Sequence, residues 1–194
     1  MEPSQLGAFA RSGADIDQPD LQYHVQPLGL AACGHDLDPF PTITVSVCHL
    51  RPESRGHVRL SAPDPLAAPE IASNYLFAAD RLVAARAIRL IRRIMAAPEL
   101  EHYKSQKFRP GDEAQSDEAL ARADGQIGTT IFHPVGTCRM GTDARAVLGG
   151  DLRVKGIEGL RVADASVMPT ITSGNTNAST LIIAEKCTAM MPGA

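Results

Sequence analysis

The chain has 194 residues, of which 44% are hydrophobic and 21% charged, and its formal net charge is −3. This composition is ordinary for one folded domain or slightly more with a sizeable core, and the weak negative charge argues against nucleic acid or an anionic membrane as a partner. Four scattered cysteines without a C-x-x-C pair predict neither a disulfide framework nor a metal site.

The N-terminal region, up to about Phe40, is predicted to be connecting chain with one strand. It is rich in Gly, Asp and Pro, and the apolar patch Leu21–Val25 is its best strand candidate. The first residues lack the basic and apolar leader of a signal peptide, and no apolar run approaches the roughly 20 residues of a membrane helix. We therefore expect a cytoplasmic protein without an integral membrane segment, and peripheral membrane association stays open.

Two alternating segments follow and predict antiparallel sheet. Apolar and polar residues alternate over 42–48 and again over 57–61, with a Pro- and Gly-containing turn at 51–56. The pattern predicts that the two segments pair with each other. Three prolines at 63, 65 and 69 predict that regular structure stops after this pair.

Two helices are predicted next. Residues 80–95 carry a wide apolar stripe that includes Val83, Ala87 and Leu90, as expected for a helix lying on a sheet. Its five arginines lie on the opposite face, which we interpret as solvated because no stacking aromatics accompany them. A second, short helix is predicted from the N-cap Ser116 to about Ala123.

The C-terminal third predicts one strand and one helix. The apolar run 160–163 is interpreted as a strand that carries Asp164 and Ala165 into a loop at its carboxyl end. A Gly- and Asn-rich loop at 173–176 then leads into a helix over about 177–190.

His133 is the strongest candidate for chemistry. A histidine taken by itself is more often structural, but this one precedes a Gly-rich segment where the backbone can approach a ligand closely. Histidine suits the role of a general base because its ordinary pKa is about 6.5, and the amide of Asn177 could donate to a developing negative charge. Neither residue can accept a hydride.

Three segments together resemble the C-terminal signature of the glucose-methanol-choline (GMC) family of flavin-dependent alcohol oxidoreductases: 133–141, 160–169 and 173–179. The resemblance implies that His133 abstracts the proton, that Asn177 faces it, and that hydride passes to N5 of FAD. An Asn in the second place resembles the choline dehydrogenase and alcohol dehydrogenase-like members. The implied flavin-binding residues are Asp164, Ala165, Asn175, Asn177, Ala178 and Ser179.

The family's dinucleotide-binding fingerprint, G-x-G-x-x-G, does not occur in the chain. The resemblance therefore implies an α+β fold: a substrate-binding region over 1–130, with an antiparallel sheet and helices on one face, and a C-terminal segment over 131–194. The strand and helix of that segment would complete a Rossmann-like FAD domain that is absent from this chain.

The expected function is that of the C-terminal part of an FAD-dependent oxidoreductase acting on the CH–OH group of a small primary alcohol. FAD would be bound mainly by the missing N-terminal domain, so the isolated chain is expected to be inactive. The absence of Trp does not favour choline itself, because large rings cage quaternary ammonium groups. Two alternatives stay open: a truncated, inactive fragment, and an accessory subunit that needs a separate flavin-binding chain.

Overall fold

The computed structural model describes residues 4–29 and 35–191, so Cys33, one of the four cysteines considered above, lies outside the described residues, as do the first three residues of the chain. The chain forms two compact units. The first unit comprises residues 1–56 and 73–129, and the second comprises 57–72 and 130–194. The division at 130/131 into a substrate-binding region and an active-site segment stays a prediction.

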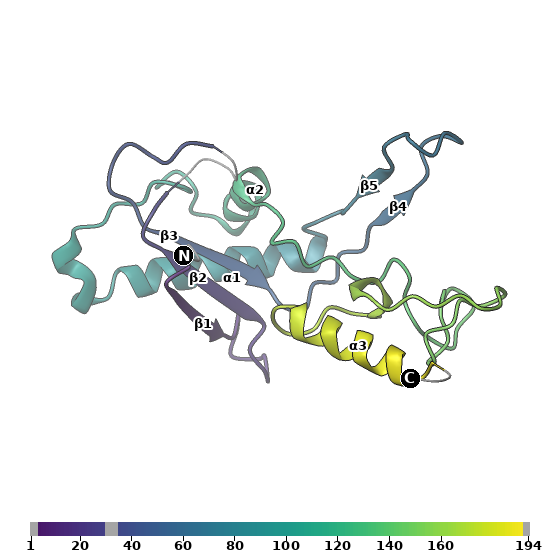
Figure 1. Cartoon of the computed structure of the whole chain (residues 1–194). Helices are drawn as coiled ribbons and strands as arrows, with labels where there is room; N and C mark the ends of the chain where they lie inside the picture. Colours follow the sequence, from purple (N-terminus) through teal and green to yellow (C-terminus); the bar gives the residue numbers. More distant parts are fainter. Residues whose placement is uncertain (1–3, 30–34, 192–194) are drawn as a thin grey trace. The chain divides into compact units, whose positions relative to one another are not determined.

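The first unit is built on a three-stranded antiparallel sheet (Figure 1). Its strands are β1 (Leu6–Ala10), β2 (Leu21–Gln26) and β3 (Thr44–His49), in the order β1-β2-β3. The predicted strand at Leu21–Val25 is confirmed as β2. The sequence did not indicate β1, because four of its five residues are exposed and no alternation marks a buried face.

Helix α1 (Ala78–Met95) packs against both the sheet and helix α2 (Asp117–Ile127), and a 3₁₀ turn η1 (Pro98–Tyr103) follows α1. On the sheet side, Ala87 is buried with Leu21 and Tyr23. On the other side, Ile88 is buried with Leu120 of α2. The predicted helices are confirmed, and their combination with an antiparallel sheet confirms the α+β class.

The solvated interpretation of the arginine face requires a correction for Arg92, which is half-buried, whereas Arg89 is exposed but also bonded to the second helix. Arg92 donates to the carbonyl oxygens of Pro110, Gly111 and Ala114 at 3.2, 2.8 and 2.6 Å. Arg89 donates to Asp117 at the start of α2. Both arginines hold the loop before α2 against α1, because a guanidinium offers several donors in a fixed plane.

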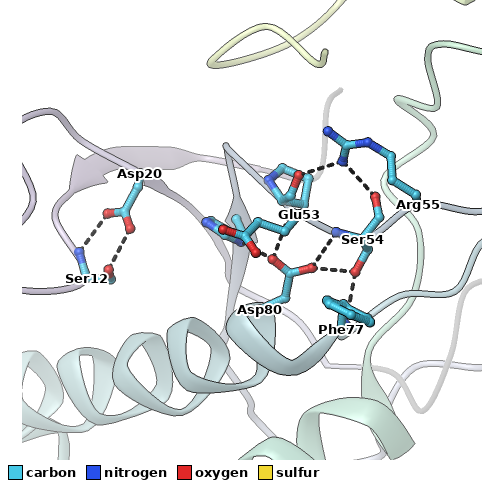
Figure 2. Close-up of polar contacts among 9 residues, drawn as sticks. Ser12, Asp20, Glu53, Ser54, Arg55, Phe77 and Asp80 are labelled. Carbon is cyan, nitrogen blue, oxygen red and sulfur yellow. Dashed lines mark hydrogen bonds and ion pairs between the residues drawn. The ribbon is translucent and has the colours of Figure 1, made fainter. Parts of the chain in front are cut away.

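A buried carboxylate ties the turn after β3 to the first turn of α1 (Figure 2). Asp80 is 4% exposed, and its oxygens accept hydrogen bonds from the N–H groups of Glu53 and Ser54, both at 2.9 Å, and from the Ser54 hydroxyl. Nδ1 of His49 lies 3.2 Å away. Burial opposes ionisation of Asp80, but these hydrogen bonds and His49 outweigh it and lower the pKa of the carboxyl.

The predicted pairing of segments 42–48 and 57–61 is wrong. β3 pairs with β2, whereas β4 (His57–Arg59) pairs with β5 (Glu70–Ala72) in a separate two-stranded sheet. Alternation identifies which residues share a face, but it does not identify the partner strand. The prediction that the prolines end regular structure is also wrong, since Pro69 directly precedes β5, where its missing N–H removes no bond of the ladder.

The second unit contains the β4–β5 hairpin, a short 3₁₀ turn η2 (Ala165–Val167) and helix α3 (Asn177–Ala189). Its core is the buried cluster of Leu148, Leu152, Val167 and Cys187. α3 confirms the predicted C-terminal helix. The run 160–163 does not form the predicted strand. Within the described part of the chain its ladder pairing is limited to one bridge, between Arg161 and Arg153.

Replacing Ser116 by Ala should destabilise the first unit by about 1 kcal/mol, because the Ser116 hydroxyl accepts the N–H of Ala119 at 3.1 Å and caps α2. Urea unfolding followed by tyrosine fluorescence measures this directly, since Tyr23, Tyr75 and Tyr103 all belong to the first unit. Ser116→Asp is the matched control, because Asp also caps helices. Equal losses in both variants would contradict the capping role.

Candidate functional site

The imidazole of His133 is held at both ring nitrogens by consecutive residues of one loop. Its Nδ1 lies 2.9 Å from Oγ1 of Thr176, and its Nε2 lies 3.1 Å from Nδ2 of Asn175. His133 is half-buried, Thr176 is buried and Asn175 is exposed. The ring is therefore fixed on its inner side and accessible beside Asn175.

Two residues close to His133, Gly136 and Phe132, have a positive backbone φ angle. Gly136 has φ +90°, in the left-handed region that glycine tolerates without steric cost. Phe132 has φ +64°, which is unfavourable for a bulky side chain, and this ring is 71% exposed. Strain of this kind concentrates at functional sites, and here it lies directly before the candidate base.

The segment after His133 is bonded to the segment that contains the predicted flavin contacts. The N–H of Cys138 donates to the carbonyl of Ser166 at 3.1 Å, and that of Met140 donates to Val167 at 2.9 Å. Asp164 lies at the start of η2, where its carboxylate accepts the N–H of Ser166 at 2.8 Å. Asp164 and Ala165 therefore belong to the same packed unit as His133.

Helix α3 begins beside His133 with its first turn uncapped by a side chain. Its N-cap residue is Thr176, whose hydroxyl contacts His133 and makes no cap hydrogen bond. The N–H groups of Ala178 and Ser179 lie in this first turn, where helix geometry supplies no acceptor. The helix start therefore offers donors and the positive end of a helix dipole, both suited to an anionic group.

The predicted site residues all lie in the second unit, but the expected pair, His133 and Asn177, is not joined by a hydrogen bond between described atoms. No hydrogen bond connects His133 to Asn177 among the described residues, and Asn177 is the exposed first residue of α3. The amide that meets His133 is that of Asn175, predicted only as a flavin contact. Sequence reasoning missed Thr176, although its place between two asparagines at a helix start was an available signal.

Other chemical groups offer no competing site. The described residues contain no group of three or more His, Cys, Asp or Glu that could hold a metal ion. Burial raises the pKa of the Cys48 thiol to about 11, which disfavours the reactive thiolate. None of the helices in residues 4–29 and 35–191 is long and apolar enough to span a membrane.

Comparison with known proteins gives consistent matches. The family model described as GMC oxidoreductase matches residues 52–184. An oxygen-dependent choline dehydrogenase of Klebsiella pneumoniae is 43% identical over 183 residues, which are 94% of this chain and 33% of that protein. The Escherichia coli protein of the same name is 41% identical over 190 residues, or 97% of this chain and 34% of the relative. The chain thus spans about a third of the length of these relatives.

Two solved structures share the fold. Pyridoxine 4-oxidase from Mesorbium loti superimposes with a TM-score of 0.87 at 29% identity, covering 97% of this chain and 38% of that one. Formate oxidase from Aspergillus oryzae gives a TM-score of 0.78 at 28% identity, covering 90% and 32%. Both similarities extend over nearly all of the described chain.

Proposed function

The chain belongs to the GMC oxidoreductase family, as its C-terminal, choline dehydrogenase-like portion, and from that premise we propose that it supplies the catalytic base of an FAD-dependent alcohol oxidoreductase. The observation that carries the proposal is the position of His133. Its imidazole is half-buried, anchored at Nδ1 and accessible at the side of Asn175, next to an uncapped helix start. A base needs this combination of fixed orientation and access to substrate.

The residues present fit a flavin. The first turn of α3 has no side-chain cap, so the N–H groups of Ala178 and Ser179 are suited to negative charge on the reduced ring. Asp164 and Ala165, with Asn175 and Asn177, are the further residues that would hold FAD. When bound, FAD would supply the acceptor for the hydride, at its N5 atom.

The remaining steps fall to side chains of this chain. Nε2 of His133 takes the proton of the substrate hydroxyl, and Nδ1 keeps its contact with Thr176 throughout. An amide N–H of Asn177 donates to the oxygen as negative charge develops on it. The supporting observation for Asn177 is its exposure at the first position of α3, two residues beyond the amide that meets His133.

The proposed substrate is a small primary alcohol. The similarity to proteins named choline dehydrogenase favours a choline-like alcohol, whereas a chain without Trp provides no large indole ring for an ammonium group. Any aromatic cage would therefore be built from Tyr and Phe or from sequence outside these 194 residues.

Activity is proposed to require a flavin-binding portion beyond the 194 residues, either in the same polypeptide or in a second chain. The chain matches only about a third of its relatives, and it contains no G-x-G-x-x-G fingerprint. Exposed apolar residues on α3 support this requirement, since Leu181 and Ile182 are 60% and 68% exposed. Without a partner, these residues would promote association, as the inactive-fragment alternative also expects.

Incubating the 194-residue chain with FAD and desalting it should leave no bound flavin, whereas the same chain with a flavin-binding N-terminal portion should retain about one flavin per complex. The physical reason is that the residues of this chain suited to FAD are few, and the uncapped helix start would not hold the cofactor alone. Flavin absorbance after desalting is the measurement. Retention by the chain alone would contradict the need for a second portion, and no retention by the pair would contradict the proposed cofactor.

A further inference from the structure

The hydroxyl of Thr176 contacts His133 and does not make the hydrogen bond that is usual for an N-cap residue. An N-cap hydroxyl normally accepts an N–H of the first turn, and that bond stabilises the helix. Thr176 has φ −84° and ψ −8°, a helical conformation in which its side chain makes no cap hydrogen bond. Its hydroxyl lies 2.9 Å from Nδ1 of His133 instead, and the residue is only 6% exposed.

The backbone of Thr176 is itself firmly held. Its carbonyl accepts the N–H of Thr180 at 2.9 Å and the Thr180 hydroxyl at 2.8 Å. The hydroxyl that contacts His133 is therefore held at the start of helix α3. The same helix packs into the core of the second unit through Cys187, near its C-terminal end. Such an anchor limits the movement of the imidazole.

The two contacts together select one tautomer of His133. In this orientation of the Asn175 amide, Nδ2 lies 3.1 Å from Nε2 and can only donate, so Nε2 is the acceptor. In a neutral imidazole the proton is then on Nδ1, which donates to Oγ1 of Thr176. The lone pair of Nε2 consequently points to the exposed side of the ring, where Asn175 lies.

We propose that Thr176 is a positioning residue for His133: it holds the imidazole in the Nδ1–H form, while the Asn175 amide occupies Nε2 until the substrate hydroxyl replaces it. This inference rests on the proposed function. When substrate binds, its O–H bond breaks and an N–H bond forms at Nε2. The Asn175 donor cannot face that new N–H, whereas the Nδ1–H to Thr176 bond persists in both protonation states.

Nitrogen-15 NMR of the 194-residue chain tests the tautomer without flavin or activity. The His133 signals are identified by their absence in His133→Gln, and spectra are taken at a pH where the imidazole is neutral. We expect the Nδ1–H form in the parent and in Thr176→Ser, which keeps the hydroxyl. Thr176→Val, of nearly equal shape, leaves an Nδ1–H without its acceptor and should shift His133 toward the Nε2–H form, with the Asn175 amide turned so that its oxygen accepts.

The matched control is Thr188→Val, which removes a hydroxyl bonded to Ala184 on the same helix and should leave His133 unchanged. If Thr176→Val fails to fold, Asn175→Asp decides: a carboxylate at this exposed position should draw the proton to Nε2. A folded Thr176→Val with the parent tautomer, or an Asn175→Asp that keeps the Nδ1–H form, would overturn the inference.

Kinetics of the flavin-loaded enzyme separate this inference from the proposed function. Thr176→Val should lower kcat about tenfold to a hundredfold with a much smaller change in KM, and Thr176→Ser should restore most of the loss. An unchanged kcat in Thr176→Val would contradict a positioning role. Full activity in His133→Gln would instead refute the proposed function, while the NMR result would still report on the tautomer.

Discussion

Replacing His133 by Ala in the flavin-loaded enzyme should lower kcat for alcohol oxidation about a thousandfold, while FAD retention stays close to that of the parent. A positioned general base contributes about a hundredfold to ten-thousandfold to a proton transfer, and the imidazole of His133 is held at both ring nitrogens, by Thr176 and by Asn175. Stopped-flow measurement of flavin reduction by the alcohol isolates the affected step.

The matched control is His102→Ala, because His102 is exposed in the first unit and contacts only Tyr103 among ring systems of the described chain. It should reduce flavin at the parent rate. Equal rates of reduction in His133→Ala and parent would show that His133 is not the base. Loss of flavin from His133→Ala would instead show that the residue serves cofactor binding.

Replacing Asp80 by Asn should destabilise the first unit by about 3 kcal/mol at neutral pH, because a buried carboxylate that accepts three hydrogen bonds is replaced by a neutral amide with only one acceptor oxygen (Figure 2). The amide nitrogen would also face backbone N–H groups that need an acceptor. Urea unfolding followed by tyrosine fluorescence reports on this unit, and Asp117→Asn is the control. Asp117 pairs with Arg89 at 2.7 Å but is more than half exposed, so its loss should cost under about 1 kcal/mol.

The effect of Asp80 should also depend on pH with a definite sign. The pKa of this carboxyl is lowered in the folded protein, so its contribution is fully present above the ordinary value of 3.8 and is lost as pH falls through the lowered folded-state value. The difference in unfolding free energy between parent and Asp80→Asn should therefore be constant near neutrality and shrink in acid. A difference that grows as pH falls below 3.8 would contradict the assignment.

Local signals in the sequence predicted the helices well and the strand partners poorly. The apolar stripe of α1 and the Ser116 cap of α2 are local sequence features. Both helices were therefore predicted with ends that differ from the observed ends by only a few residues. β4 was assigned to the wrong partner because pairing joins distant segments and depends on where the chain returns. Asp80 was not singled out at all, since a buried carboxylate in a helix's first turn looks like an ordinary dipole-favoured acid.

The sequence by itself determined the family resemblance, the mixed α+β class and the short list of site residues around His133, because motifs and helical periods are local properties of the chain. Only the tertiary structure decided which atoms meet the imidazole. Asn175 and Thr176 contact its two nitrogens, whereas Asn177, the residue favoured by the motif, makes no hydrogen bond to it among the described residues. The loop before α3 and the segment at His133 are distant in the sequence and become neighbours only in the folded chain. Hydrogen bonds form only when the atoms lie about 3 Å apart, so the sequence alone does not identify these partners.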